Sequence, residues 1–181
     1  RQSIGIRPLK PEYEKIDAID DLESLAAYFA YSTKLSGNVP IKFEVHEDLG
    51  NPEVYALYIR QSGLGVQGPY GLQDRDYYLN DDTHSKEILQ AYGNHIFNMF
   101  RQAAIDCDRG CVSEIVDMEK AIASLHSSKE EMRDFQKMYN AYSIDSLNAI
   151  APNLNWALLF NELGIPDIEK VIVLQPEFIR G

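Results

Sequence analysis

Residues 56–79 read ALYIRQSGLGVQGPYGLQDRDYYL, the most informative stretch of the chain. It begins as an apolar run typical of a strand, continues through a glycine-rich turn, and ends in a dense polar–aromatic string. That string supplies one candidate cluster: Asp74, Arg75, Asp76, Tyr77 and Tyr78. An arginine between two carboxylates can hold a loop in place through charge-assisted hydrogen bonds. Tyrosine side chains can bury their apolar rings while their hydroxyl groups keep a polar partner. We predict a structural role for this cluster, with substrate contact as the alternative.

The strand in this stretch has a partner immediately upstream. Ile41, Phe43 and Val45 alternate with polar residues, which is typical of a half-buried strand. A turn sequence at 50–52 separates them from the second apolar run, at 54–59. We therefore predict a β-hairpin over 41–59.

Helices are predicted on both sides of the hairpin. Residues 1–19, which contain Pro8 and Pro11, are predicted to form an extended lead-in, and Asp20 is predicted to cap a helix that ends before Pro40. Apolar periodicity predicts four helices further along, at 85–105, 112–125, 143–150 and 153–163, and a short strand at 171–174. In the second of these helices the apolar side is predicted to consist of Ile115, Met118, Ala121, Ile122 and Leu125. The sequence thus predicts a single, mainly helical domain over 1–181 with a small β-hairpin or sheet.

The bulk composition limits the classes of partner. The 181 residues carry a net charge of −11, and 45% of them are hydrophobic. That charge opposes binding to nucleic acid and to anionic membranes, because both require clustered Lys and Arg. No apolar run approaches the roughly 20 residues needed to span a bilayer. The start at Arg1, without Met, leads us to expect either that a leader and further sequence were removed or that this is an excised piece of a longer protein.

Five segments of the chain occur in the order of the motifs of one known family. They are the string at 74–79, Asp117-Met118-Glu119-Lys120-Ala121-Ile122-Ala123, Glu131-Met132-Arg133-Asp134 with Lys137 and Tyr139-Asn140, Ala151-Pro152 with Trp156, and Gln175-Pro176-Glu177-Phe178. Together they resemble the neprilysin-like zinc metallopeptidases, which include neprilysin and the endothelin-converting enzymes. The resemblance covers about residues 40–178 and corresponds to the N-terminal half of such an enzyme.

Enzymes of this family have two mostly helical lobes closed around a cavity, with zinc held by His-Glu-x-x-His and a glutamate from a later Glu-x-x-x-Asp. The resemblance implies that this chain is the N-terminal, non-catalytic lobe, which limits access to the cavity and so favours small peptides. It implies zinc in the parent enzyme and no cofactor in this chain. The implied partners are the C-terminal catalytic lobe of the same polypeptide and oligopeptide substrates. The implied location is exported: periplasmic, extracellular or a membrane-anchored ectodomain.

Two partial matches to the zinc motifs favour structural interpretations. His46 and Glu47 begin like a zinc-binding helix, but Gly50 stands where the second histidine is needed, and His46 lies in a strand pattern. Glu130 and Asp134 match Glu-x-x-x-Asp without the accompanying His-Glu-x-x-His, which is a common chance pattern in an acidic chain. We therefore predict no catalytic residue and no metal ligand here, and no peptidase activity for this chain alone.

A glycine pattern also favours a structural interpretation. Gly63-Leu64-Gly65-Val66-Gln67-Gly68 matches Gly-x-Gly-x-x-Gly, which binds dinucleotides when a helix follows at once. Pro69-Tyr70-Gly71 follows instead, so we predict a tight loop. His84, His95 and His126 are dispersed along the sequence, which disfavours a metal site.

The two cysteines allow a disulfide. Cys107 and Cys111 flank a short turn in which Gly110 is expected to let the backbone reverse. A tight turn can bring such neighbours within the Cα separation of about 4.4–6.8 Å that a disulfide requires. We predict a Cys107–Cys111 disulfide for an exported parent and two reduced thiols for a cytosolic one.

The leading hypothesis is therefore the access-restricting lobe of a zinc-dependent endopeptidase. The rival, from a different class, is a non-enzymatic helical binding module of the same fold. A His-Glu-x-x-His motif downstream in the gene would decide for the enzyme.

Overall fold

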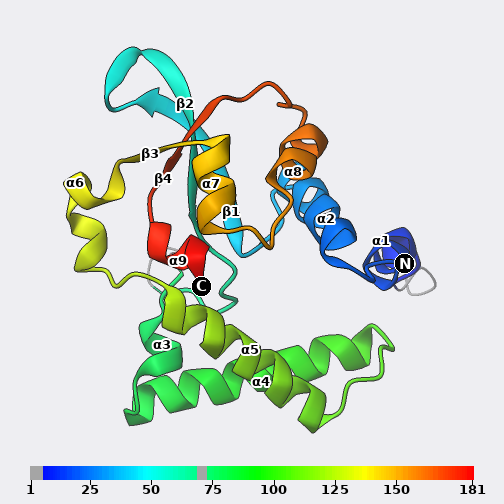
Figure 1. The fold of residues 1–181 in the computed structure, drawn as a ribbon. Coiled ribbons are helices and arrows are strands. Elements are labelled where there is room, and N and C mark those ends of the chain that lie inside the picture. The colour runs from blue at the N-terminus through cyan, green and yellow to red at the C-terminus, as the bar shows by residue number, and fades with distance from the viewer. Residues whose placement is uncertain (1–5, 69–72) are drawn as a thin grey trace. The chain divides into compact units, whose positions relative to one another are not determined.

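The structure, a computed structural model, describes residues 6–68 and 73–181. Its strands are interspersed among the helices along the chain (Figure 1). In order they are η1 (Arg7–Leu9), α1 (Lys10–Asp17), α2 (Leu22–Lys34), β1 (Ile41–Asp48), β2 (Asn51–Gln61), α3 (Asp76–Leu79), α4 (Thr83–Gln102), α5 (Arg109–Leu125), η3 (Glu131–Arg133), α6 (Phe135–Met138), β3 (Asn140–Ser143), α7 (Ile144–Ile150), α8 (Trp156–Leu163), β4 (Lys170–Val173) and α9 (Pro176–Arg180). The fold is mainly helical with a small sheet, as predicted.

The sheet has four strands in the order β1-β2-β4-β3. The pair β1/β2 is an antiparallel hairpin in which Phe43 lies opposite Ile59, so the predicted hairpin is confirmed. The pair β2/β4 is parallel, with Tyr58 opposite Ile172, and β3 pairs antiparallel with β4. The edge strand β3 was not predicted, because its four residues, NAYS, lack an alternating apolar pattern.

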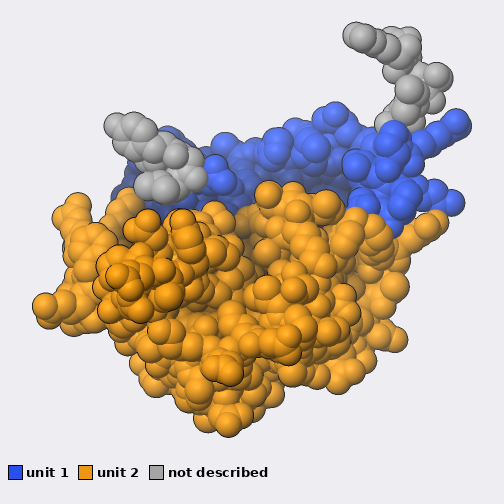
Figure 2. Space-filling view, turned by 90° about the horizontal axis from the view of Figure 1, so that it is seen from above, with its two compact units in different colours: residues 1–13, 64–125 blue, residues 14–63, 126–181 orange. Residues whose placement is uncertain are grey.

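The chain divides into two compact units, coloured separately in Figure 2. Unit 1 consists of residues 1–13 and 64–125, and unit 2 of residues 14–63 and 126–181. Helices α3, α4 and α5 belong to unit 1, whereas the sheet and helices α2, α7, α8 and α9 belong to unit 2. The single domain over 1–181 stays a prediction, because compactness alone does not say whether the units fold together. Among the described helices, none is long and apolar enough to cross a membrane.

The core of unit 2 lies between the sheet and helix α8. Trp156 and Phe160 of α8 are fully buried, and their rings lie 5.9 Å apart. Phe160 also meets Phe43 of β1 edge-on at 6.3 Å, and the Trp156 indole donates a hydrogen bond to the Ala151 carbonyl at 3.0 Å. Asn155 caps α8 by accepting a hydrogen bond from the Leu158 amide. The capped helix thus places Phe160 against the hairpin, with Trp156 packed beside Phe160.

The N-terminal segment differs from its prediction. The extended lead-in is wrong for η1 and α1, because Pro8 and Pro11 occupy first helical turns, where the missing N–H is not needed. The N-cap of α2 is Asp21, and Asp20 lies one residue before it. Asp21 accepts from the Ser24 amide at 2.7 Å, and the Ser24 hydroxyl accepts from the Asp21 amide at 3.1 Å, which forms a capping box.

The buried side of α5 also differs from its prediction. Met118 and Leu125, expected on the apolar side, are exposed. The buried side instead carries Val112, Glu119 and Ala123. The prediction is confirmed for Ile115 and Ile122, which are partly buried and pack against the core, and wrong for Met118, Ala121 and Leu125, because the buried stripe runs through Glu119.

Candidate functional site

The candidate cluster at 74–78 lies in unit 1, where a buried carboxylate joins it to the glycine-rich loop. Glu119 of α5 is only 8% exposed. One of its oxygens accepts a hydrogen bond from the Tyr92 hydroxyl at 2.8 Å. The other accepts from the Tyr78 hydroxyl and from the Gly65 amide, the latter at 3.2 Å. Glu119 therefore links α3, α4 and the glycine-rich loop to α5.

The glycine-rich loop fits closely over this carboxylate. The Val66 amide donates to the Tyr78 hydroxyl at 2.8 Å, so the same tyrosine accepts from the loop and donates to the carboxylate. A Cβ atom on Gly65 would lie 1.8 Å from the Tyr92 hydroxyl, so glycine is the residue that fits this position. These contacts favour the predicted loop over a dinucleotide site. The segment 69–71, included in that prediction, lies outside the described residues.

Tyr78 of the cluster and Tyr92 of α4 both donate hydrogen bonds to Glu119. Burial, and then the neighbouring Glu119 carboxylate, raise the pKa of Tyr78 and the pKa of Tyr92 above the ordinary value. Both hydroxyls therefore stay protonated at neutral pH and donate to the carboxylate. A carboxylate that accepts three hydrogen bonds in a buried setting is a structural clamp, which we call the Glu119 clamp.

The other residues of the string support the turn into α3. Asp74 is buried, and its carboxylate accepts from the Asp76 amide at 3.1 Å. The Tyr77 ring meets the His84 ring edge-on at 6.2 Å. The pairing of Arg75 with its neighbouring carboxylates stays a prediction.

Sequence reasoning missed the centre of the clamp. In the sequence, Glu119 stands within the family motif at 117–123, and Tyr92 lies within the predicted helix at 85–105. A signal was available, because Glu119 lies four residues after Ile115 and four before Ala123, on the same helical face. A charge inside an apolar stripe indicates a buried and partnered group.

Unit 2 contains a second buried carboxylate, which sequence reasoning also missed. Asp48, at the end of β1, accepts from the Lys170 ammonium at 2.7 Å, the Tyr139 hydroxyl at 2.6 Å and the Gly50 amide at 2.8 Å. The hydrogen bonds from Lys170, Tyr139 and Gly50 lower the pKa of Asp48 to about 2. Asp48 is therefore ionised at neutral pH and fixes the turn of the hairpin.

The partial zinc motifs do not assemble into a site. His46 lies exposed on β1, with its Nε2 atom 3.6 Å from a Glu44 carboxylate oxygen, as the strand interpretation predicted. Glu130 and Asp134 flank the 3-10 turn η3. Over residues 6–68 and 73–181, no three His, Cys, Asp or Glu side chains are grouped to hold a metal ion. The described residues therefore do not fit the zinc of the resembled family.

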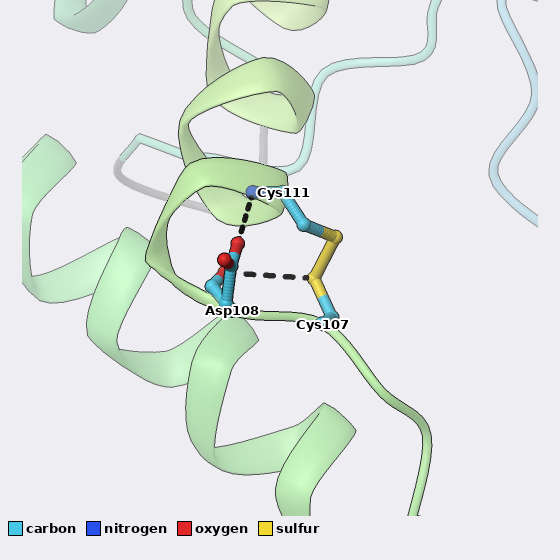
Figure 3. The surroundings of a disulfide bond; sticks show 3 residues. All are labelled: Cys107, Asp108 and Cys111. Carbon is cyan, nitrogen blue, oxygen red and sulfur yellow. Dashed lines mark hydrogen bonds between the residues drawn. A yellow bond between two sulfur atoms is a disulfide. The ribbon is translucent and has the colours of Figure 1, made fainter.

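The cysteines lie at the start of α5 (Figure 3). Cys107 and Cys111 form a disulfide, with their Cα atoms 5.3 Å apart. The Asp108 carboxylate accepts from the Cys111 amide at 2.9 Å and so caps the first helical turn. The expected role of Gly110 is wrong, because Gly110 is already helical, whereas Ala104 before it takes a positive φ of 54°.

We expect protein expressed in an oxidising compartment to contain no free thiol. The cysteines can pair without distorting the backbone, because their Cα separation lies inside the usual range for disulfides. Thiol titration of the unfolded, unreduced protein measures this directly. The same titration after reduction should find both thiols, and two free thiols before reduction would refute the bond.

The chain matches a known family and several characterised proteins. The family model described as "Peptidase family M13" matches residues 1–181. Endothelin-converting enzyme 1 of Mus musculus is 29% identical over 143 residues, which are 75% of this chain and 18% of that protein. The Homo sapiens enzyme is 28% identical over 143 residues, with the same coverage. The chain thus spans less than a fifth of the length of these relatives.

Solved structures show the same fold. The zinc metalloprotease Zmp1 of Mycobacterium tuberculosis, in complex with an inhibitor, matches 99% of this chain with a TM-score of 0.87 and 26% identity. The match covers 27% of the Zmp1 chain. PepO from a Lactobacillus strain matches 98% of this chain with a TM-score of 0.68 and 16% identity, which shows a shared fold alone.

Proposed function

This chain belongs to peptidase family M13, and from that premise we propose that it is the N-terminal, access-restricting lobe of a zinc-dependent endopeptidase acting on small peptides. The observation that carries the proposal is the family match over all 181 residues. The similarity to a zinc metalloprotease over 99% of the chain supports it. A lobe of this kind contributes by excluding large substrates, because a closed cavity admits only chains that fit within it.

We place the zinc and its ligands outside this chain, in the C-terminal catalytic lobe of the same polypeptide. The described residues offer no group of metal ligands, and the chain spans 27% of the zinc metalloprotease that it resembles. Zinc would there supply an activated water for attack on a peptide bond. The partners of this chain are accordingly that lobe and, within the cavity, oligopeptide substrates.

We also place the parent enzyme in an exported location. The support is the Cys107–Cys111 disulfide, because such bonds persist in oxidising compartments. The titration of thiols described above tests whether the bond forms, and fractionation of the source cells tests the location itself.

Metal analysis and peptidase assays test the proposed function. We expect the 181-residue chain to hold no stoichiometric zinc and to leave peptides intact. The whole polypeptide should hold zinc, cleave short peptides faster than folded proteins, and lose activity with a chelator. Chelator-sensitive zinc and activity in the 181 residues alone would refute the assignment of the catalytic groups. A whole polypeptide without His-Glu-x-x-His and without activity would instead identify a helical binding module.

A further inference from the structure

The outer end of the β1/β2 hairpin, residues 45–55, exposes several large apolar side chains. Val45 is 64% exposed and Tyr55 is 74% exposed. The strand register places both on the same face of the hairpin as Phe43 and Ile59, which pack into the core of unit 2. The apolar face therefore continues beyond the part of the sheet that α8 covers. Figure 1 shows this end of the hairpin projecting from the sheet.

The opposite face of the hairpin end carries an exposed apolar side chain beside the exposed His46. Val54 lies on this second face and is exposed, and Leu49 in the turn is 67% exposed. An antiparallel ribbon normally keeps one face polar where it meets water. A hairpin end with apolar side chains on both faces is instead typical of a segment that a partner surrounds.

Hydrogen bonds hold Leu49 outward in a fixed turn. The Leu49 amide donates to the hydroxyl of the buried Tyr58 at 3.1 Å, and that hydroxyl donates to the Glu47 carbonyl at 3.0 Å. The buried Asp48 carboxylate beside it binds Lys170 and the Gly50 amide. The turn is thus organised by buried groups on either side of an exposed leucine, and a preformed apolar tip loses little entropy on docking.

A groove beside the turn extends this surface. The groove has a volume of about 400 Å³ and is lined by Leu49, Gly50, Phe135, Gln136 and Tyr139. Phe135, on the short helix α6, is 74% exposed. Residues separated by more than 80 positions in the sequence therefore form one apolar surface, which we call the hairpin-end surface.

The remainder of the parent polypeptide is the occupant that fits best. The chain spans 27% of the zinc metalloprotease that it resembles, so in a parent of that length most of the polypeptide lies outside these residues. A second copy is disfavoured, because each copy carries a net charge of −11 and the copies repel. Glu47 lies directly opposite Tyr55, and Glu53 lies two residues before Tyr55 on the same strand; both are exposed and favour a partner with lysine or arginine there.

We propose that the hairpin-end surface docks onto the C-terminal lobe of the same polypeptide, against an apolar patch edged by basic residues. This inference rests on the proposed function and adds the surface through which this chain is joined to the rest of the enzyme. Leu49, Tyr55 and Phe135 are the apolar anchors of the contact.

Cysteine labelling of Leu49→Cys and Tyr55→Cys tests the proposal. Each variant is made in the whole polypeptide and in the 181-residue chain, and its reaction with a maleimide is timed without reductant, so that the native cysteines stay paired. Labelling at both positions should be at least about tenfold slower in the whole polypeptide, because it then requires opening of the contact. Leu35→Cys, at a 62% exposed position in the same unit, is the control and should react at about the same rate in both proteins.

Peptidase activity of the same samples separates the two proposals. Equal labelling rates in an active whole polypeptide would overturn the docking surface and leave the proposed function standing. Slower labelling of the 181-residue chain as its concentration rises would show that a second copy covers the surface. Slower labelling that appears only when short peptides are added would show that a substrate covers it. Either result would overturn the docking assignment. An inactive whole polypeptide without the zinc motif would overturn the proposed function, and with it this inference.

Discussion

Replacing Glu119 by alanine is expected to destabilise unit 1 by about 3 kcal/mol, because a buried donor left without its acceptor costs about 1–3 kcal/mol. The substitution removes the acceptor of the Tyr78 and Tyr92 hydroxyls and of the Gly65 amide at once. Urea unfolding followed by circular dichroism measures the loss. Hydrogen exchange should show the loss of protection first in the loop at 64–68, which the carboxylate holds.

A control on the same helix makes this prediction specific. Glu114 is an exposed glutamate of α5, so Glu114→Ala makes the same chemical change without burial. Its effect should stay within about 0.5 kcal/mol, as for most surface substitutions. Glu119→Gln keeps one acceptor oxygen and should fall between the two alanine variants. Equal stability of Glu119→Ala and Glu114→Ala would show that the clamp does not hold unit 1 together.

The structure was predictable from the sequence where the signal is local. The alternation of Ile41, Phe43 and Val45 and the turn after them predicted the hairpin, because strand pairing across a short turn depends on neighbouring residues. The fold class and the family followed from motifs that stand in a fixed order. The helix α1 was not predicted because a segment containing Pro8 and Pro11 favoured an extended lead-in, although prolines in a first helical turn are tolerated.

The buried polar groups were not predictable in the same way, because their partners are distant in sequence. Asp48 and Lys170 are separated by 122 positions, and Tyr78 and Glu119 by 41. The sequence indicates that Tyr78 buries its ring and needs a partner for its hydroxyl, but it does not name the partner. Strand β3 was not predictable for the same reason. Its partner β4 is distant in sequence, and residue 140 pairs with residue 173, about 30 positions further along the chain.

The largest expected effect of a single substitution is that of Trp156→Ala in unit 2. Trp156 is 0% exposed, packs against Phe160 and donates to the Ala151 carbonyl. Truncating a buried tryptophan to alanine costs about 3–5 kcal/mol through lost burial and the cavity that remains. For a chain of this length such a loss should lower the melting temperature by roughly 10 °C. Thermal unfolding followed by circular dichroism measures it.

Two matched substitutions locate the source of that loss. Trp156→Phe keeps an aromatic ring but removes the donor to Ala151, so it should cost less than the alanine variant. Phe135→Ala also removes a large aromatic side chain, but from a position that is 74% exposed, so in the 181-residue chain it should change stability by less than about 0.5 kcal/mol. In the whole polypeptide Phe135→Ala should instead be destabilising, because the proposed docking buries that ring. If Trp156→Ala and Phe135→Ala were equally mild in the 181-residue chain, the core of unit 2 would not lie where α8 meets the hairpin.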